Sequence, residues 1–140
     1  MHTVFCIDTS CSMKLNNALI DARTFVYDYI SALMDDFERK SRCYFTSLVT
    51  FGEETKLLQQ WTKDVNTLLE SIENLPLSGH GDLATGLEYS KNAALSPCNY
   101  VTTTNNTLLR EIIVITDGRA TDFDAKRKHN GNKREVKQLC

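Results

Sequence analysis

Alternating apolar and polar positions divide the chain into strands and helices. A continuous apolar run at 3–8 predicts a buried strand, and apolar residues at every third or fourth position over 15–37 predict a long amphipathic helix. The remaining patterns predict three more strands, 41–51, 56–61 and 111–116, and two more helices, 65–72 and 82–95. Strands that alternate with helices predict an α/β fold with a mostly parallel sheet.

Length and composition narrow the classes of protein to consider. A chain of 140 residues predicts a single domain, 1–140, with 41% hydrophobic and 24% charged residues, as is usual for a globular domain. The formal charge of −2 gives no basic field, so we expect no nucleic-acid partner. No apolar run approaches the ~18 residues of a membrane span, so we expect no membrane insertion.

The start of the chain and its cysteines favour a cytoplasmic location. Strand-like sequence begins at Thr3, which leaves no room for a signal peptide. The five cysteines are odd in number and lack the spacing of metal ligands. We therefore expect a protein of the reducing cytosol.

Acidic residues follow two of the predicted strands. Asp8 ends the first strand, and the hydroxyls of Ser10 and Ser12 follow at alternate positions; Asp117 ends the strand at 111–116. One carboxylate with neutral oxygens suits a hard cation, above all Mg²⁺, with Mn²⁺ or Ca²⁺ as alternatives. Helix capping would explain one such residue but hardly three, and an Asp-Gly turn is the alternative for Asp117.

The residues 8–12, Asp-Thr-Ser-Cys-Ser, resemble the Asp-x-Ser-x-Ser signature of von Willebrand factor type A (VWA) domains, which include integrin inserted domains. The run 113–118 resembles the later strand of that family, which ends in an Asp. The resemblance implies a Rossmann-like three-layer α/β/α fold with one antiparallel edge strand and a metal-ion-dependent adhesion site. In this chain that site would be formed by Asp8, Ser10, Ser12 and Asp117.

The sequence departs from the family pattern in two places. Gly81 stands where the family has a metal-site Thr, and the adjacent Asp82 either replaces that Thr as a ligand or caps the helix that it opens. The family pattern also continues with a further strand and helix after the Asp-Gly element. We therefore expect a domain that is truncated at its C-terminus or is completed by a partner.

The resemblance implies a protein–protein interaction module rather than an enzyme. Its cation would bridge to an Asp or Glu carboxylate of another protein, and the domain would serve as a subunit of a larger complex. One alternative is a Mg²⁺-dependent hydrolase or phosphatase, although a second Asp is missing at Ser10, where dehalogenase-like phosphatases carry one. The other is a scaffold subunit with a purely structural metal.

Overall fold

The computed structural model describes residues 1–39, 43–96 and 109–119, with the side chains of 37–39 left out. The elements are β1 (His2–Asp8), the 3₁₀ segment η1 (Cys11–Asn17), α1 (Ala18–Arg39), β2 (Phe45–Phe51), β3 (Thr55–Thr62), α2 (Val65–Glu73), α3 (Leu83–Leu95) and β4 (Arg110–Ile115). The strands and helices predicted within these residues are thus present, with shifts of a few residues at their ends.

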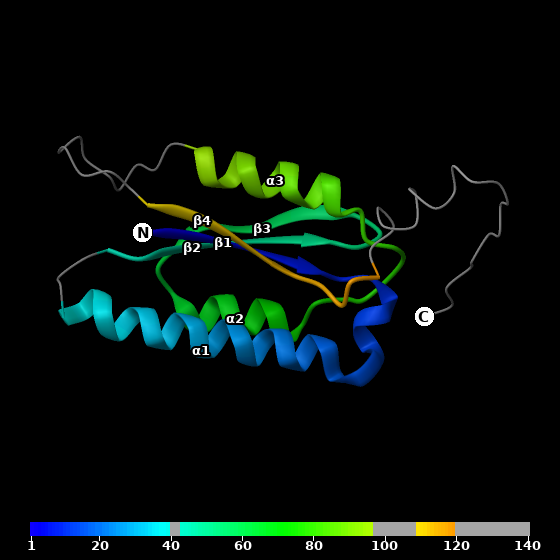
Figure 1. Cartoon of the computed structure of the whole chain (residues 1–140), viewed down its shortest axis with the longest axis horizontal. Coiled ribbons are helices and arrows are strands. Elements are labelled where there is room, and N and C mark those ends of the chain that lie inside the picture. Colours follow the sequence, from blue (N-terminus) through cyan, green and yellow to red (C-terminus); the bar gives the residue numbers. More distant parts are fainter. Residues whose placement is uncertain (40–42, 97–108, 120–140) are drawn as a thin grey trace, which may run out of the picture.

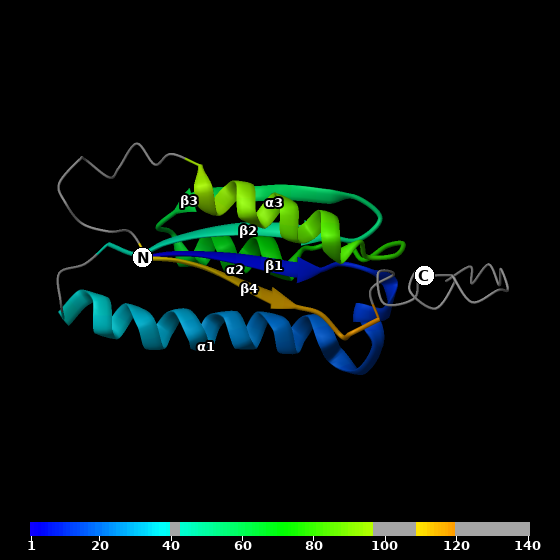
Figure 2. The same ribbon diagram turned by 45° about the horizontal axis from the view of Figure 1, so that its top comes forward.

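The described strands form one twisted sheet between two layers of helices (Figure 1). The strand order is β3-β2-β1-β4; β1 is parallel to both of its neighbours, and β3 is antiparallel to β2. Helix α3 covers one face of the sheet, and α1 and α2 cover the other (Figure 2). The prediction of a three-layer, mostly parallel α/β fold with an antiparallel edge strand is confirmed.

Strand β1 lies at the centre of the core, and all seven of its residues are buried. Phe5 and Ile7 pack into the cluster beneath α1 and α2. Val4 and Cys6 point to the opposite face, where the core includes Phe51. Because successive strand residues face opposite sides, only a strand that is apolar on both faces can occupy this position.

The long helix begins three residues later than the apolar spacing predicts. Leu15, expected at its start, is 51% exposed and lies in η1. Asn16 and Asn17 have φ angles of 53° and 58°, a left-handed conformation that Asn tolerates better than most residues. This left-handed pair separates the loop after β1 from the helix, which starts at Ala18.

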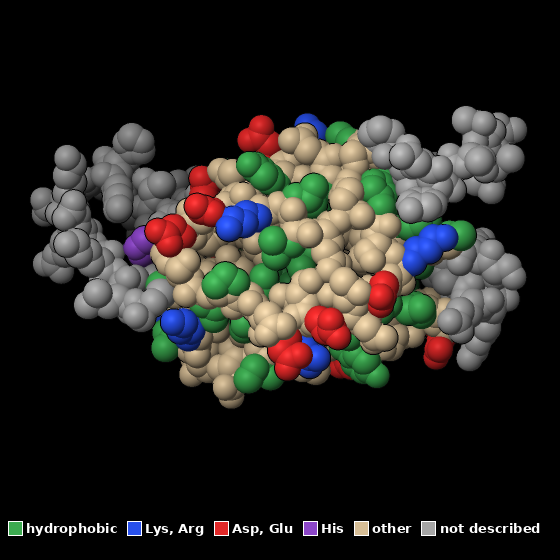
Figure 3. Space-filling model, turned by 180° about the vertical axis from the view of Figure 1, so that it is seen from behind, with side chains coloured by type: hydrophobic (Ala, Val, Ile, Leu, Met, Phe, Trp, Pro, Cys, Tyr) green, Lys and Arg blue, Asp and Glu red, His purple; other side chains and the backbone are tan. Residues whose placement is uncertain are grey.

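Two predictions concern residues outside the described part of the chain. The prediction of a truncated C-terminus concerns the chain after residue 119, and most of the polar segment 96–106 is likewise not described. Among the described helices, none has both the length and the hydrophobicity needed to cross a membrane. The face seen in Figure 3 mixes acidic, basic and hydrophobic side chains rather than presenting one sign of charge.

A buried histidine links three strands at the end of the sheet opposite to Asp8. The His2 ring stacks on Trp61 at a centroid distance of 3.8 Å, and its Nε2 lies 2.7 Å from Ser47 Oγ. Its Nδ1 is buried without a hydrogen-bond partner among the described residues. Burial, and next the positive charges of Arg110 and of the N-terminal amine, lower the pKa of His2 to about 4.

We predict that His2 makes the fold sensitive to acid. The unfolded chain binds a proton at His2 near pH 6.5, whereas the folded chain binds it only near pH 4, so stability is lost as the pH falls between these values. The loss amounts to roughly 3 kcal/mol, since each pKa unit corresponds to about 1.4 kcal/mol. Urea unfolding of His2→Gln at several pH values measures it, because this variant lacks the buried imidazole.

The exposed His80 supplies the matched control. His80→Gln is expected to keep the acid sensitivity of the parent chain. A His2→Gln variant whose stability falls with pH as steeply as that of the parent would contradict the assignment.

Candidate functional site

The fold brings the predicted acidic strand ends together. Strand β1 lies between β2 and β4 and is parallel to both, so all three strands end at the same edge of the sheet. The strand order reverses at β1, and ligands of open α/β sheets bind at such reversal points. The predicted site requires that the strands ending in Asp8 and Asp117 be neighbours. They are, since β1 and β4 pair directly.

The Asp8 carboxylate is fully buried at this edge. Its Oδ1 accepts a hydrogen bond of 2.8 Å from the backbone N–H of Ser10, and its Oδ2 accepts one of 2.7 Å from the hydroxyl of Thr116. Within the described residues, no Lys, Arg or His forms an ion pair with Asp8. A buried carboxylate without a cationic partner is costly, which makes Asp8 the unusual group of this region.

The serine side chains lie beside Asp8 but do not cap a helix. Ser10 is the N-cap residue of η1, yet its side chain forms no capping hydrogen bond. Its hydroxyl instead lies 3.0 Å from the hydroxyl of Ser12, and both residues are buried. The capping alternative for Ser10 is therefore wrong, and two neutral oxygens lie close together in the loop that directly follows the buried Asp8.

The 78–81 segment closes the site from a second direction. Backbone hydrogen bonds join Ser78 N to Thr9 O at 3.0 Å and Cys11 N to Gly79 O at 3.1 Å. A Cβ at Gly81 would lie 3.1 Å from Asp8 Oδ1 and 3.0 Å from the Phe51 ring. Gly81 thus faces Asp8, as expected for the family's Thr position, but the space there holds no larger side chain without displacing a neighbour.

Asp82 takes the capping role that the sequence left open. It is the N-cap residue of α3, and its carboxylate accepts hydrogen bonds from the backbone N–H and the hydroxyl of Thr85, at 3.3 and 2.7 Å. Asp82 is exposed, whereas Asp8 is buried. These bonds confirm that Asp82 caps α3, and its role as a metal ligand in place of the hydroxyl that Gly81 lacks stays a prediction.

At the end of β4, Thr116 and Asp117 are oriented differently. The Asp117 Oδ1 accepts a 3.0 Å hydrogen bond from Arg119 N, and Gly118 has a φ of 79°. Asp117 therefore closes a turn, while Thr116 makes the direct bond to Asp8. Thr116 is the residue of the candidate site that the sequence did not predict; the hydroxyl directly preceding the Asp-Gly pair was the available signal.

The side-chain oxygens that could bind a metal ion at this site are mostly hydroxyls. No group of three or more His, Cys, Asp or Glu side chains surrounds a common point in the described parts of the chain, so the three carboxylates Asp8, Asp82 and Asp117 do not gather. Asp8 with the Ser10 and Ser12 oxygens still fits a hard cation, because Mg²⁺ needs only one or two carboxylates and retains several waters.

A sequence model of the von Willebrand factor type A domain matches residues 3–119. The match includes the whole candidate site and every described strand and helix except the first residue of β1. The chain belongs to the von Willebrand factor type A domain family. VWA domains mediate protein–protein interactions, often with the help of a metal ion, and are mostly interaction modules rather than enzymes.

Solved structures share the fold. The VWA domain of the type V pili tip protein Mfa5 from Porphyromonas gingivalis is 24% identical with a TM-score of 0.62, over 85% of this chain and 38% of that one. A structure of the three N-terminal domains of Mfa5 is 24% identical with a TM-score of 0.63, over 85% of this chain and 20% of that one. The VWA domain of SpRpn10 is 21% identical with a TM-score of 0.54, over 70% of this chain and 52% of that one.

The chain thus spans between a fifth and about half of the solved structures that it resembles. At these identities the likeness shows the fold alone. No curated protein matches the chain at a significant level.

We predict that Thr116→Val destabilises the domain by about 1.5–3 kcal/mol, because it removes a hydrogen bond to a buried carboxylate. Urea unfolding measures the effect. The matched control is Thr46→Val on β2, whose hydroxyl makes only a 3.4 Å bond to a backbone carbonyl and should cost less. Equal losses in the two variants would show that the bond to Asp8 carries no special weight.

Proposed function

We propose that this VWA domain binds a divalent cation at Asp8, Ser10 and Ser12 and uses it to hold a carboxylate of another protein. Mg²⁺ is the proposed cation, with Mn²⁺ or Ca²⁺ as alternatives, and Asp117 contributes directly or through water. The observation that carries the proposal is the buried Asp8 carboxylate, which has hydroxyls beside it and no cationic partner among the described residues. A bound cation would neutralise that charge.

The small number of carboxylates in the proposed site favours a role in binding another protein. A cation held by one or two carboxylates and neutral oxygens keeps net positive charge, which attracts an anionic group from outside. The capping role of Asp82 supports this reading, since a further carboxylate ligand would make the cation less attractive to a partner. The proposed partner is therefore a protein that presents an Asp or Glu side chain.

Membership in a larger complex belongs to the same proposal. Mfa5 is described as a pili tip protein, and VWA domains bind other proteins. An interaction module of this family would act as a subunit that joins two other components. We propose no catalytic reaction for it.

Titration with Mn²⁺, followed by electron paramagnetic resonance, tests the site with the metal alone. We predict that Asp8→Asn lowers Mn²⁺ affinity at least about tenfold, since even changes to groups behind the metal ligands cost that much. The same variant should be at least as stable as the parent in EDTA, because it removes a buried charge that lacks a cationic partner. In the parent chain, Mn²⁺ should raise the melting temperature.

Two isosteric controls sharpen the result. Asp82→Asn keeps a good N-cap residue and should leave Mn²⁺ affinity unchanged, and Asp21→Asn on α1 should do the same. Unchanged Mn²⁺ affinity in Asp8→Asn, or no binding at millimolar Mn²⁺, would overturn the proposed site.

A simple carboxylate distinguishes the interaction role from a structural metal. Acetate should lower the water-proton relaxation caused by protein-bound Mn²⁺, because it displaces a water from the ion. If Mn²⁺ raises the melting temperature but acetate leaves relaxation unchanged, the scaffold alternative is favoured. Turnover of an aryl phosphate that Asp8→Asn abolishes would instead favour the phosphatase alternative.

The cytoplasmic location remains a proposal with its own measurement. Cys6 and Cys43 are free, which agrees with this proposal, but Cys11 is disulfide-bonded, which speaks against it. Disulfides persist mainly in oxidising compartments, so a cytoplasmic protein is expected to keep all five cysteines reduced. A thiol assay under denaturing conditions on protein trapped directly from cells counts them, and fewer than five free thiols would contradict the location.

A further inference from the structure

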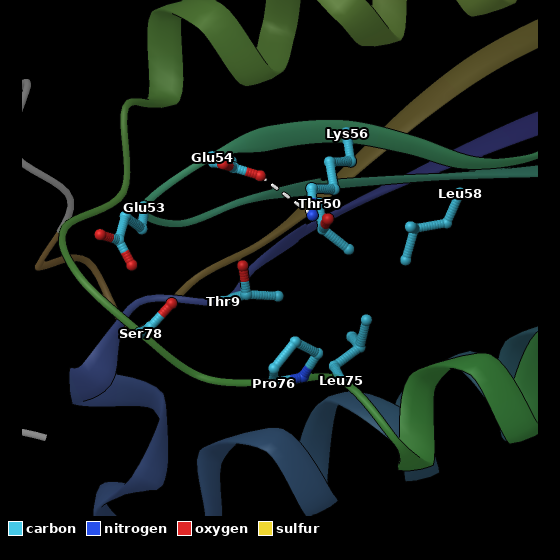
Figure 4. A pocket seen from close by; sticks show the side chains of 9 residues that line it. All are labelled: Thr9, Thr50, Glu53, Glu54, Lys56, Leu58, Leu75, Pro76 and Ser78. Atoms are coloured by element: carbon cyan, nitrogen blue, oxygen red, sulfur yellow. Dashed lines mark ion pairs between the residues drawn. The ribbon is translucent and has the colours of Figure 1, made fainter.

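A second candidate binding site lies at the same end of the sheet, between the β2–β3 hairpin and the segment after α2 (Figure 4). It is a cavity of about 300 Å³. Ligand pockets begin near this volume, so the cavity has room for one long side chain rather than for a large cofactor. Leu58 lines one side, and Leu75 and Pro76 line the other (Figure 4).

Two threonine hydroxyls line this cavity and have no hydrogen-bond partner among the described residues. Thr9 is 6% and Thr50 is 5% exposed, and both line the cavity. Neither hydroxyl forms a hydrogen bond to any of the described residues. Neither oxygen is among the fully enclosed side-chain atoms that lack a partner, so both hydroxyls are open to the cavity and available to bond a polar guest.

The charges around the cavity are predominantly acidic. The Glu54 carboxylate lies 3.0 Å from the Lys56 ammonium, and both side chains are largely exposed. Glu53 also lines the cavity and has no ion-pair partner within the part of the chain that the structure describes. The excess of one negative charge favours a cationic guest.

The walls of the cavity are held in place by backbone hydrogen bonds. Glu53 N donates to Ser78 O at 3.1 Å, and Thr9 N donates to Phe51 O at 2.8 Å. Gly79, with a φ of 65°, allows the close approach, since a Cβ there would lie 2.9 Å from the Glu53 Cα. Because the cavity is already formed, binding of a guest does not cost the free energy of ordering its walls.

We propose that this cavity receives an arginine side chain of the protein partner. Its aliphatic part would lie against Leu58 and Pro76, and its guanidinium would bind the Glu54 carboxylate. The Glu53 carboxylate, which points away from the cavity in Figure 4, would turn inward to join it. Arginine suits the site better than lysine, because a planar guanidinium can bind a carboxylate through two parallel hydrogen bonds. The exposed Glu54–Lys56 pair is weak and gives way to such a guest.

The cavity adds to the proposed function, on which it rests for the existence of a protein partner. Thr9 lines the cavity, while the adjacent Asp8 and Ser10 belong to the candidate metal site. A partner that places an acidic side chain at the metal would therefore find the cavity at the same end of the sheet. The partner is expected to carry an arginine near its metal-binding acidic residue.

Nuclear magnetic resonance with N-acetyl-arginine-methylamide tests the cavity in the full chain, with EDTA present. The amide signals of Thr50, Glu53 and Glu54 should shift in a saturable manner, with millimolar affinity. Thr50→Val and Glu53→Gln should each weaken binding by about three- to fivefold, as expected for loss of one hydrogen bond or one exposed charge pair. Glu70→Gln, on the exposed face of α2, is the matched control and should have no effect.

Two further probes decide the chemistry. The citrulline analogue has nearly the same shape but no charge and should bind at least threefold more weakly; the glutamate analogue should not shift the cavity signals. Equal binding of arginine and citrulline, stronger binding of glutamate, or shifts confined to other residues would overturn the proposal. Because EDTA removes the metal, this result and the Mn²⁺ titration can fail independently of each other.

Discussion

A carboxylate that is buried at the end of the central strand constrains everything around it. Removing Asp8 from water costs several kcal/mol unless other groups compensate, and the chain supplies a backbone N–H from Ser10 and a hydroxyl from Thr116. These two bonds fix the loop after β1 and the end of β4 at one point. The absence of a side chain at Gly81 lets a third segment close over the same carboxylate.

The position of this carboxylate follows from the sheet topology. A strand apolar on both faces must lie inside the sheet, and here it has a parallel neighbour on each side. Polar residues that follow such a strand are carried to the edge where the neighbouring strands also end. The apolar run before Asp8 therefore places the site as much as Asp8 itself does.

Local patterns predicted the elements, but contacts between distant segments decided the roles of particular residues. The helix after β1 was evident from its spacing, yet its start at Ala18 depends on two left-handed asparagines whose conformation no periodicity indicates. Asp82 could equally cap or ligate from its sequence position, and only its bonds to Thr85 show that it caps α3. Thr116 was missed because its partner lies 108 residues away.

The two ends of the β1–β4 pair each hold a carboxylate, and they differ in how that carboxylate is enclosed. At the start of the strands, Thr3 donates a hydroxyl to Glu111, and Tyr29 donates a second one to the same oxygen. Glu111 is only half-buried, so its carboxylate remains accessible to solvent. At the other end Asp8 receives one hydroxyl and one N–H, but it is fully buried. The first carboxylate is open to solvent, whereas the second is enclosed by the protein, and this difference in burial is the reason for proposing a cation at Asp8 and none at Glu111.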